Sequence, residues 1–320
     1  AAGGMDFQAR VAAWVAVHIL AEKDATPPWD LPVEVTLEWL RCQSKEAVDD
    51  LLVGTSVGGY IFAQIKERLD CSKTPTSDLA SALDQFVRQF INRRTINQPL
   101  HPMKDRLVLI TSSRSSEPIR IHLPTVLRRV QRNQPFSEAT SNKKESDVFS
   151  VVKEHLERSW QRILGIDPSE EDLRQLLSLI HIQILDVDKG EVGEREAINL
   201  LRRAILQDPD QAEAAWMELI SLASLYATER SGADRSILQR SLLEAGFDLK
   251  AVRSYQEDIN KLKKNSMDTF EALSRFTRIR VGCHTVRIQR PCVTALRQAA
   301  ERSEERRVGK ECRSRWSPYH

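Results

Sequence analysis

The sequence predicts an α/β domain with a mixed sheet, followed by a mostly α-helical region. Short apolar runs with strand-like alternation occur between residues 33 and 112, and segments with helical spacing lie before, between and after them. The resulting order is helix, three strands, helix, strand, helix. The last strand must cross over a helix to rejoin the sheet, which makes the sheet mixed.

The first half of this domain contains the strands that carry the candidate chemistry. Residues 6–22 have apolar side chains at helical spacing and predict a helix. Residues 33–42 alternate apolar and polar side chains, which predicts a strand with one solvated face. Two more strands are expected in VDDLLVGTSVGGYIFAQIK, residues 48–66, on either side of a Gly-Gly turn. We therefore expect the strand that carries Gln64 to pair with the strand that carries Asp50.

The second half of the domain ends at a polar, turn-rich segment. Its expected elements are a helix, a strand and a helix, over residues 76–93, 105–112 and 118–133. The segment NQPFSEATSNKKES, residues 133–146, favours a domain boundary. We accordingly assign residues 1–135 to the first domain, residues 136–146 to a linker, and residues 147–301 to a helical connector region.

The connector region predicts helices with two interruptions. IHIQILDVD, residues 180–188, predicts a strand, and residues 278–290 predict a small hairpin. No repeat of fixed period is present, so a solenoid is not expected. The helices are expected over residues 147–165, 169–180, 193–207, 210–228, 233–246 and 248–275.

The last residues are expected to be an artefactual tail. RSEERRVGKECRSRWSPYH, residues 302–320, resembles the conceptual translation of a sequencing-library adapter, and we expect it to pack against nothing. The tail carries five Arg, one Lys and three Glu, so without it the formal net charge changes from +2 to −1. A basic pI therefore does not indicate nucleic-acid binding here. The natural chain is expected to continue beyond Glu301, and AAGG before Met5 indicates a reading frame clipped upstream.

Composition argues against membrane and zinc-binding classes. No stretch approaches the roughly 20 uninterrupted apolar residues of a membrane span, and no basic segment precedes an apolar core at the start. The four cysteines outside the tail lack the C-x-x-C spacing of zinc sites. We expect a cytoplasmic protein with free thiols and no membrane partner.

The polar residues of the central strands point to metal-assisted phosphodiester hydrolysis. Because side chains alternate along a strand, Gln64 and Lys66 lie on one face, with Asp50 across from Gln64 on the preceding strand. The backbone carbonyl of Ile65 is a further oxygen ligand. Carboxylate, amide and carbonyl oxygens suit Mg²⁺ (or Mn²⁺), and an ammonium group beside them suits phosphate chemistry. By the same alternation Asp49, the competitor of Asp50, is expected on the opposite face unless a bulge redirects it.

These residues also carry a family resemblance. Asp, a strand, a turn and then Gln-x-Lys resembles the PD-(D/E)xK nuclease superfamily, in the Mrr-like variant with glutamine at the second acidic position. Residues 5–130 are similar to the nuclease domains that begin bacterial anti-phage effectors, through DFQARVAAWV, VDDLLV, QIK and ALDQFVRQF. The resemblance implies a restriction-endonuclease-like fold with DNA as the substrate. It makes Asp50 and Gln64 metal ligands, and it gives Lys66 the role of activating water or stabilising the phosphate.

Two further glutamines and one absent motif qualify the resemblance. Many relatives place a glutamate on the first helix near the site, where this chain has Gln8. Gln85 on the second helix is a candidate for orienting the scissile phosphate. A STAND-type ATPase often follows in that family, but no G-x-x-x-x-G-K-[ST] motif occurs here, so that partner is expected in cis beyond this segment. Homo-oligomerisation is left open.

Two hypotheses follow from these residues. The first is a magnesium-dependent DNA endonuclease domain that acts as the effector of an anti-phage defence protein. The second is a catalytically decayed nuclease fold that serves as a nucleic-acid-binding or scaffold module, with Gln8 and Gln64 as symptoms of lost carboxylates. The position of Asp50 relative to Gln64 distinguishes them, because the active enzyme requires both in one cleft with Lys66.

Overall fold

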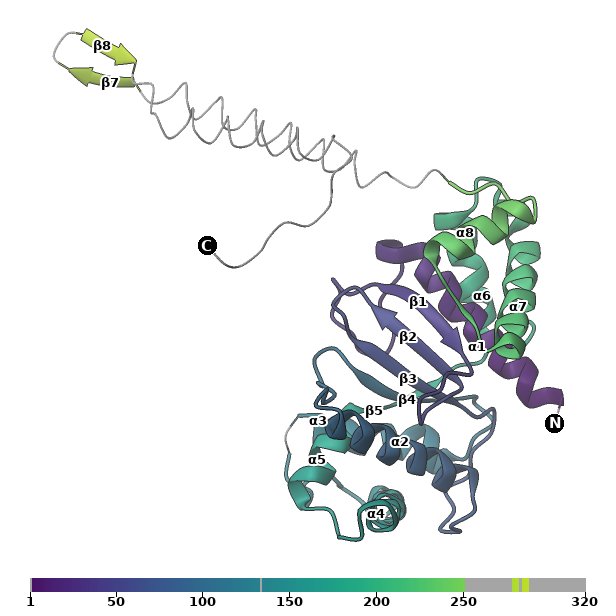
Figure 1. Ribbon diagram of the computed structural model, residues 1–320, viewed down its shortest axis with the longest axis vertical. Helices are drawn as coiled ribbons and strands as arrows, with labels where there is room; N and C mark the ends of the chain where they lie inside the picture. The colour runs from purple at the N-terminus through teal and green to yellow at the C-terminus, as the bar shows by residue number, and fades with distance from the viewer. Residues whose placement is uncertain (1, 133, 251–277, 282–283, 288–320) are drawn as a thin grey trace. The chain divides into compact units, whose positions relative to one another are not determined.

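The computed structural model describes residues 2–132, 134–250, 278–281 and 284–287 (Figure 1). The chain forms two compact units, residues 1–250 and 251–320. In the second unit, β7 (Arg278–Val281) and β8 (His284–Arg287) pair as an antiparallel hairpin, which confirms the hairpin expected there. The helix expected beyond Lys250 and the tail over residues 302–320 lie outside the described residues.

A mixed sheet forms the centre of the first unit, as predicted, and it has six strands, two of them from beyond residue 112. Its strand order is β5-β4-β3-β2-β1-β6. The β3–β4 and β4–β5 pairs are parallel, and the other three pairs are antiparallel. The strands are β1 (Leu37–Cys42), β2 (Leu51–Thr55), β3 (Tyr60–Ile65), β4 (Arg106–Thr111), β5 (Ile180–Ile184) and β6 (Gly232–Asp234).

Helices cover both faces of this sheet and make a three-layer unit (Figure 1). Helices α1, α6, α7 and α8 pack on one side, which we name the α1 face, and α2 to α5 pack on the other, the α2 face. No helix in the described part of the chain is both long and apolar enough to cross a membrane. The α-helices are α1 (Ala2–Ala21), α2 (Asp78–Thr95), α3 (Leu123–Gln131), α4 (Lys143–Leu164), α5 (Glu170–Leu179), α6 (Val192–Leu200), α7 (Ala212–Glu229) and α8 (Arg235–Glu244). Short 3₁₀ and π segments are η1 (Glu22–Asp24), η2 (Pro118–His122), η3 (Leu201–Ile205) and η4 (Pro209–Gln211).

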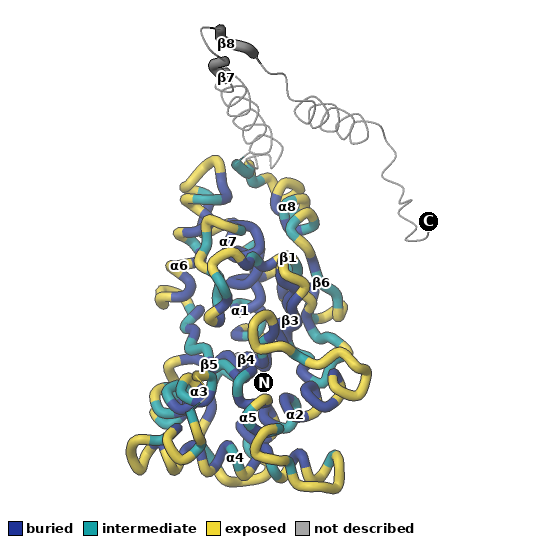
Figure 2. Tube along the Cα trace, turned by 90° about the vertical axis from the view of Figure 1, so that its left-hand side faces the viewer, coloured by how far each residue is buried: buried dark blue, intermediate teal, exposed yellow. Residues whose placement is uncertain are grey.

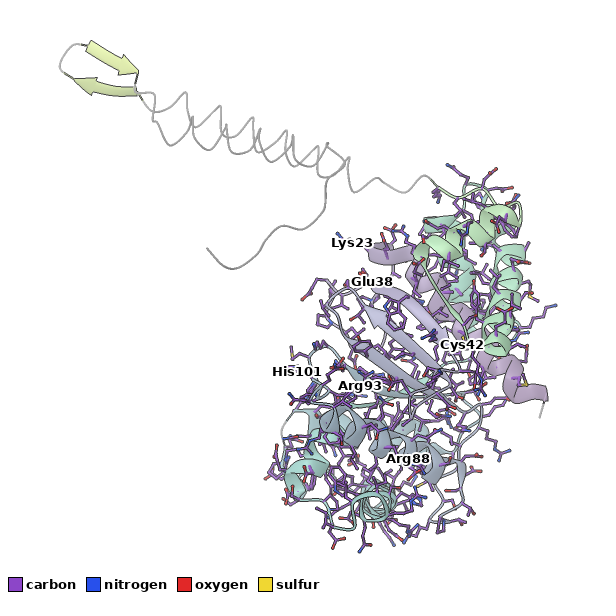
Figure 3. The ribbon with its side chains drawn as sticks, in the orientation of Figure 1. Lys23, Glu38, Cys42, Arg88, Arg93 and His101 are labelled. Carbon is purple, nitrogen blue, oxygen red and sulfur yellow. The ribbon has the colours of Figure 1, made fainter. Side chains whose placement is uncertain are left out.

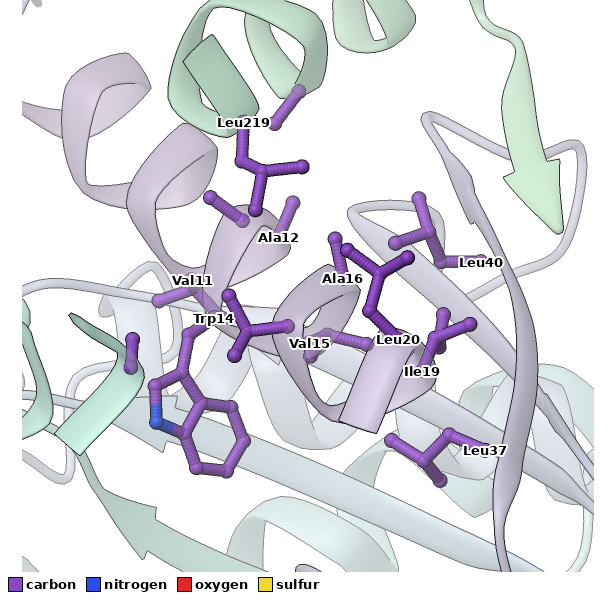
Figure 4. Packing of buried hydrophobic residues seen from close by; sticks show 14 of the residues in the cluster. Val11, Ala12, Trp14, Val15, Ala16, Ile19, Leu20, Leu37, Leu40 and Leu219 are labelled. Atoms are coloured by element: carbon purple, nitrogen blue, oxygen red, sulfur yellow. The ribbon is translucent and has the colours of Figure 1, made fainter. Parts of the chain in front are cut away.

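Helix α1 is buried because it lies between the sheet and α7. Figure 4 shows Ala12 beside Leu219 of α7, while Val15 and Ile19 lie toward the sheet. A helix that is apolar on all sides needs neighbours on all sides, and α1 obtains them from both layers. Figure 2 shows this burial as dark-blue stretches in α1 and in the neighbouring strands.

Helix α2 covers the opposite face with an apolar stripe that includes Phe86 and Phe90, packed on Phe62 of β3. The helix begins where the Ser77 side chain caps it by accepting a hydrogen bond from the Ala80 amide at 3.2 Å. Arginines in its last turn suit the negative end of the helix dipole. The cap and the stripe together fix which polar side chains of α2 face the sheet.

The Gly-Gly turn joins β2 to β3 as predicted, and each glycine has its own reason. Gly58 has a φ of +69°, a backbone conformation that L side chains rarely adopt. A Cβ atom on Gly59 would lie 2.1 Å from the backbone oxygen of Lys104, so only glycine fits there. The turn sets the register in which Leu51 lies opposite Ala63.

The first strand is shorter than predicted and changes face midway. We expected it over residues 33–42, but β1 begins at Leu37, and Val33 is exposed. An irregularity between Leu37 and Trp39 shifts the alternation. Leu37 and Leu40 then join the α1-face core, while Trp39 packs against the α2-face core.

The domain boundary expected over residues 136–146 is not found. Strand β5 (Ile180–Ile184) pairs with β4, and β6 (Gly232–Asp234) pairs with β1, so the predicted helical connector supplies both edges of the sheet. Residues 1–250 are one compact unit. The polar segment after α3 is a surface connection within that unit, because backbone pairing recruits strands from far along the chain.

Candidate active site

The predicted site residues meet at one end of the two central strands, where β2 begins and β3 ends. Because Leu51 pairs with Ala63, the next residues outward are Asp50 and Gln64. The Gln64 Nε2 atom donates a hydrogen bond to Asp50 Oδ2 at 2.5 Å, and the Ile65 backbone N–H donates to the same oxygen at 2.8 Å. The structure therefore brings the predicted carboxylate and amide into direct contact.

Lys66 continues β3 toward the same end of the strands. Its backbone N–H donates to the Ile110 carbonyl of β4 at 2.9 Å, which extends the parallel pairing by one residue. Alternation along the strand therefore places its side chain on the α2 face with Gln64. The Lys66 charge acts favourably on the Asp50 carboxylate, so the three predicted catalytic residues form one group.

Asp50 is poorly solvated for a carboxylate. Burial raises the pKa of Asp50 to about 6, against the lowering effects of the Ile65 N–H bond and the Lys66 charge and with a further raising effect of Asp49. Desolvation disfavours the charged form, and the available partners compensate only in part. At neutral pH the site holds a negative charge that lacks sufficient positive counterparts.

Asp49 lies on the α2 side, which corrects the expectation that it faces the other side of the sheet. Gln85 of α2 donates from Nε2 to Asp49 Oδ1 at 3.3 Å. The expectation assumed that the strand already includes Asp49, but β2 begins at Leu51. Strand alternation does not extend into the preceding loop, so both aspartates approach α2.

Gln8 is not part of this group in the described structure. It lies half-buried on α1, and none of its hydrogen bonds reach Asp50, Gln64 or Lys66 within the described residues. Helix α1 packs on the opposite face of the sheet, which separates it from the α2-face cluster.

Sequence reasoning missed Gln43, which follows the last residue of β1. Gln43 has a φ of +48°, and its side chain hydrogen-bonds Asp50 while its backbone N–H donates to the Asp50 carbonyl at 3.2 Å. Cys42, labelled in Figure 3, marks this end of β1, and burial raises the pKa of its thiol to about 12. The left-handed backbone conformation of Gln43 is what marks it as a candidate site residue. This conformation is seen only in the structure and not in the sequence.

The oxygen atoms at this end of the strands suit a hard divalent cation. The Oε1 atoms of Gln64 and Gln85 are both buried without a hydrogen-bond donor. Ile65 directs its N–H toward Asp50, and its C=O points to the same side because both groups of one strand residue do so. Within the described residues no group of three or more His, Cys, Asp or Glu side chains is placed to hold a metal. A cation here would therefore combine few carboxylates with neutral oxygens, which fits Mg²⁺.

Comparisons with known proteins give a distant structural likeness. No family model matches the chain, and no curated protein matches it. The Cap4 SAVED/CARF-domain containing receptor of Acinetobacter baumannii is similar at 12% identity and a TM-score of 0.41, covering 76% of this chain and 46% of the receptor. The Moraxella osloensis Cap4 receptor is similar at 11% identity and a TM-score of 0.42, covering 77% and 48%. The chain thus spans about half the length of these receptors, and the likeness concerns overall arrangement only.

Proposed function

We propose that this chain is a metal-dependent nuclease that hydrolyses phosphodiester bonds of DNA at the edge formed by β2 and β3. The observation that carries the proposal is the contact of the half-buried Asp50 carboxylate with Gln64, whose Oε1 lacks a donor, beside the charge of Lys66. Asp50, Gln64 and the Ile65 carbonyl would hold Mg²⁺ (or Mn²⁺), with Asp49 close by. The cation would supply the positive charge that the site lacks and would polarise the phosphate and the attacking water.

Lys66 is the residue proposed to act on the reacting atoms. It either stabilises negative charge on the phosphate as an ammonium or accepts a proton from the attacking water as a neutral amine. Gln64 and the Ile65 N–H orient the Asp50 carboxylate, because both donate to its Oδ2 atom, and the Gln43 side chain adds a further hydrogen bond. Gln85 is proposed to orient the scissile phosphate through its Nε2 atom, which in this structure donates to Asp49 Oδ1. The effector role in anti-phage defence and an ATPase partner in cis stay predictions that rest on the sequence resemblance.

A decayed nuclease fold that binds nucleic acid without cutting it is the second candidate. Two observations favour it: Gln8 makes no hydrogen bond to Asp50, Gln64 or Lys66 in the described part of the chain, and that part of the chain offers no three-member metal-binding group of acids, histidines or cysteines. The contact between Asp50 and Gln64 favours the enzyme, because an exposed Asp50 turned away from Gln64 is what decay predicts.

The test is cleavage of supercoiled plasmid DNA by the full chain with Mg²⁺, beside a matched RNA substrate. Lys66→Ala should reduce cleavage below detection while the far-UV CD spectrum and melting temperature stay unchanged. Lys153→Ala is the matched control, since Lys153 lies on α4 in an exposed i,i+4 pair with Glu157. If Lys66→Ala cuts DNA as fast as Lys153→Ala, the mechanism is wrong. Binding without cleavage by the parent chain would support the decayed fold.

A further inference from the structure

Helix α2 presents a second set of residues to the sheet, four residues apart. Gln85, Gln89 and Arg93 lie on one side of the helix, and we name them the polar stripe. Their neighbours Phe86 and Phe90 are buried and apolar. Polar side chains on a buried helix face need partners, and all three of these find them in the segment that leads into β2 or on the sheet beside it.

Gln89 is fully buried, and both ends of its amide are bonded. Its Oε1 accepts hydrogen bonds from the backbone N–H groups of Ala47 at 2.9 Å and Val48 at 3.3 Å. Its Nε2 donates to Glu46 Oε2 at 2.7 Å. Three bonds from one side chain therefore hold three consecutive residues of the segment.

Arg93 fixes the other carboxylate oxygen of Glu46. Its Nη2 donates to Glu46 Oε1 at 2.8 Å, and its guanidinium carbon lies 5.0 Å from the Tyr60 ring centre and 5.1 Å from that of Phe62. Both rings belong to β3, so Arg93 (labelled in Figure 3) links Glu46 to the strand that ends in Gln64. Gln89 and Glu46 therefore rest on the same sheet as the candidate site.

The segment they hold has little regular structure of its own. Residues 43–50 connect β1 to β2 without a helix or strand, and Asp49 and Asp50 follow directly after Val48. Asp50 must lie within bonding distance of Gln64 and Ile65, which leaves little tolerance in this connection. A displacement of about 1 Å in such a site is enough to lower a rate 100-fold.

We propose that Gln89 is a positioning residue of the site, which, with Glu46 and Arg93, fixes the segment from which Asp49 and Asp50 project. This inference rests on the proposed function, because positioning matters to catalysis only if Asp50 holds the metal. Its physical content is independent of catalysis, however: without Gln89 the segment loosens, water reaches Asp50, and Asp50 loses its constant contact with Gln64.

The experiment compares two glutamines that each anchor backbone from a helix. Gln89→Met removes the anchor at the site and keeps volume and helix propensity. Gln131→Met is the matched control, since Gln131 of α3 donates to the Ile180 carbonyl at 3.0 Å away from the site. For each full-length variant we would measure stability by urea unfolding, hydrogen exchange of the Ala47 and Val48 amides by NMR without divalent ions, Mg²⁺ affinity by calorimetry, and plasmid cleavage.

Both variants should lose some stability, but only Gln89→Met should alter the site. The Ala47 and Val48 amides should exchange faster because they lose their acceptor, Mg²⁺ affinity should drop about 10-fold or more, and cleavage at saturating Mg²⁺ should drop comparably. If Gln89→Met matches Gln131→Met in all four measurements, Gln89 is merely structural and the inference is wrong. If the parent neither binds Mg²⁺ nor cuts, the proposed function fails, and hydrogen exchange of the Ala47 and Val48 amides still decides the positioning role.

An exchange of the two partners provides the rescue. Gln89→Glu alone places two carboxylates in contact and should loosen the segment as Gln89→Met does. The double variant Glu46→Gln/Gln89→Glu restores one donor and one acceptor, and Glu at position 89 still accepts from the Ala47 and Val48 amides. It should return the exchange rates of the Ala47 and Val48 amides and the Mg²⁺ affinity most of the way to the parent values. A double variant no better than Gln89→Glu would overturn the assigned bonds.

Discussion

The two faces of the sheet each hold a poorly solvated ionisable group, fully buried at His18 and half-buried at Asp50, and desolvation shifts the pKa values of the two groups in opposite directions. His18 lies in the α1-face core, where desolvation lowers its pKa to about 4 despite a bond from its ring Nδ1 to the Trp14 carbonyl. Asp50 lies at the edge of the α2 face, where desolvation raises its pKa to about 6. At pH 7 His18 is neutral and suited to its surroundings, whereas Asp50 is charged in surroundings that oppose the charge. The α1 face therefore holds its ionisable group in the neutral form, which favours folding. On the α2 face, where β2 begins and β3 ends, Asp50 keeps a charge that lowers the stability of the fold.

The largest loss of stability should come from a cavity in the core between α1 and the sheet. Ile19→Ala removes a fully buried side chain between α1 and the sheet and should lower the free energy of unfolding by about 2–5 kcal/mol. Urea unfolding measures it, with the exposed Ile166→Ala as control. A loss equal to that of the control would mean that the α1 face is not a well-packed core. The difference drawn here between the surroundings of His18 and those of Asp50 would then be wrong.

The next effect concerns pH on the α1 face. Because the folded pKa of His18 lies below the ordinary value of 6.5, the unfolded chain binds the extra proton between pH 6.5 and 4. The stability contributed by neutral His18 is complete above pH 6.5 and is lost as the pH falls toward 4. His18→Phe should remove up to about 3 kcal/mol of this pH dependence. Urea unfolding of both proteins from pH 4 to 7.5 tests it; parallel curves would contradict the assignment.

The pH dependence of stability should have the opposite sign at Asp50, and Asp50→Asn should remove it. Because the folded pKa of Asp50 is raised, the folded chain holds the proton between pH 3.8 and about 6, and stability falls as the pH rises through that range. An asparagine oxygen can still accept from Gln64 and Ile65 without the poorly solvated charge. The variant should be more stable than the parent by up to about 3 kcal/mol at pH 7.5, and about equal to it below pH 4.

The measurement for this variant is urea unfolding without divalent ions, with Asp70→Asn as the exposed control. Cleavage by Asp50→Asn should be absent. An Asp50→Asn protein less stable than the parent at pH 7.5 would show that the carboxylate is well compensated, which removes the difference between the two faces.

The smallest change in stability should come from adding a negative charge beside Asp50. Gln64→Glu places a second carboxylate against Asp50, so the metal-free protein should lose about 1–2 kcal/mol of stability. Mg²⁺ should raise its melting temperature more than that of the parent, and cleavage should persist at lower Mg²⁺. Thermal unfolding across a Mg²⁺ titration checks this, and a variant that Mg²⁺ fails to stabilise would argue against a cation between these side chains.

The pairing at the site could be predicted from sequence because local rules determine it. A Gly-Gly turn set the register, and alternation placed Gln64 and Lys66 on one face. The same rules failed for Asp49 and Trp39, since one lies before the strand begins and the other follows an irregularity. Gln43 and Gln89 were missed because their roles depend on a backbone angle and on contacts more than 40 residues apart. The domain boundary failed for a similar reason: β6 is three residues long and is recognised only by its partner β1.

The placement of β5 and β6 at the two edges of the sheet has a consequence for synthesis on the ribosome. The first four strands emerge before their outer partners exist, so β1 and β4 leave the exit tunnel with unpaired edges. The sheet is complete only after Asp234 has been translated, and helix α1 lacks its packing partner α7 for most of the same time. At about 5–20 residues per second, an incomplete sheet persists for several seconds in every nascent chain. Chaperone dependence and aggregation of chains that stop near residue 145 should therefore exceed those of chains that reach residue 250.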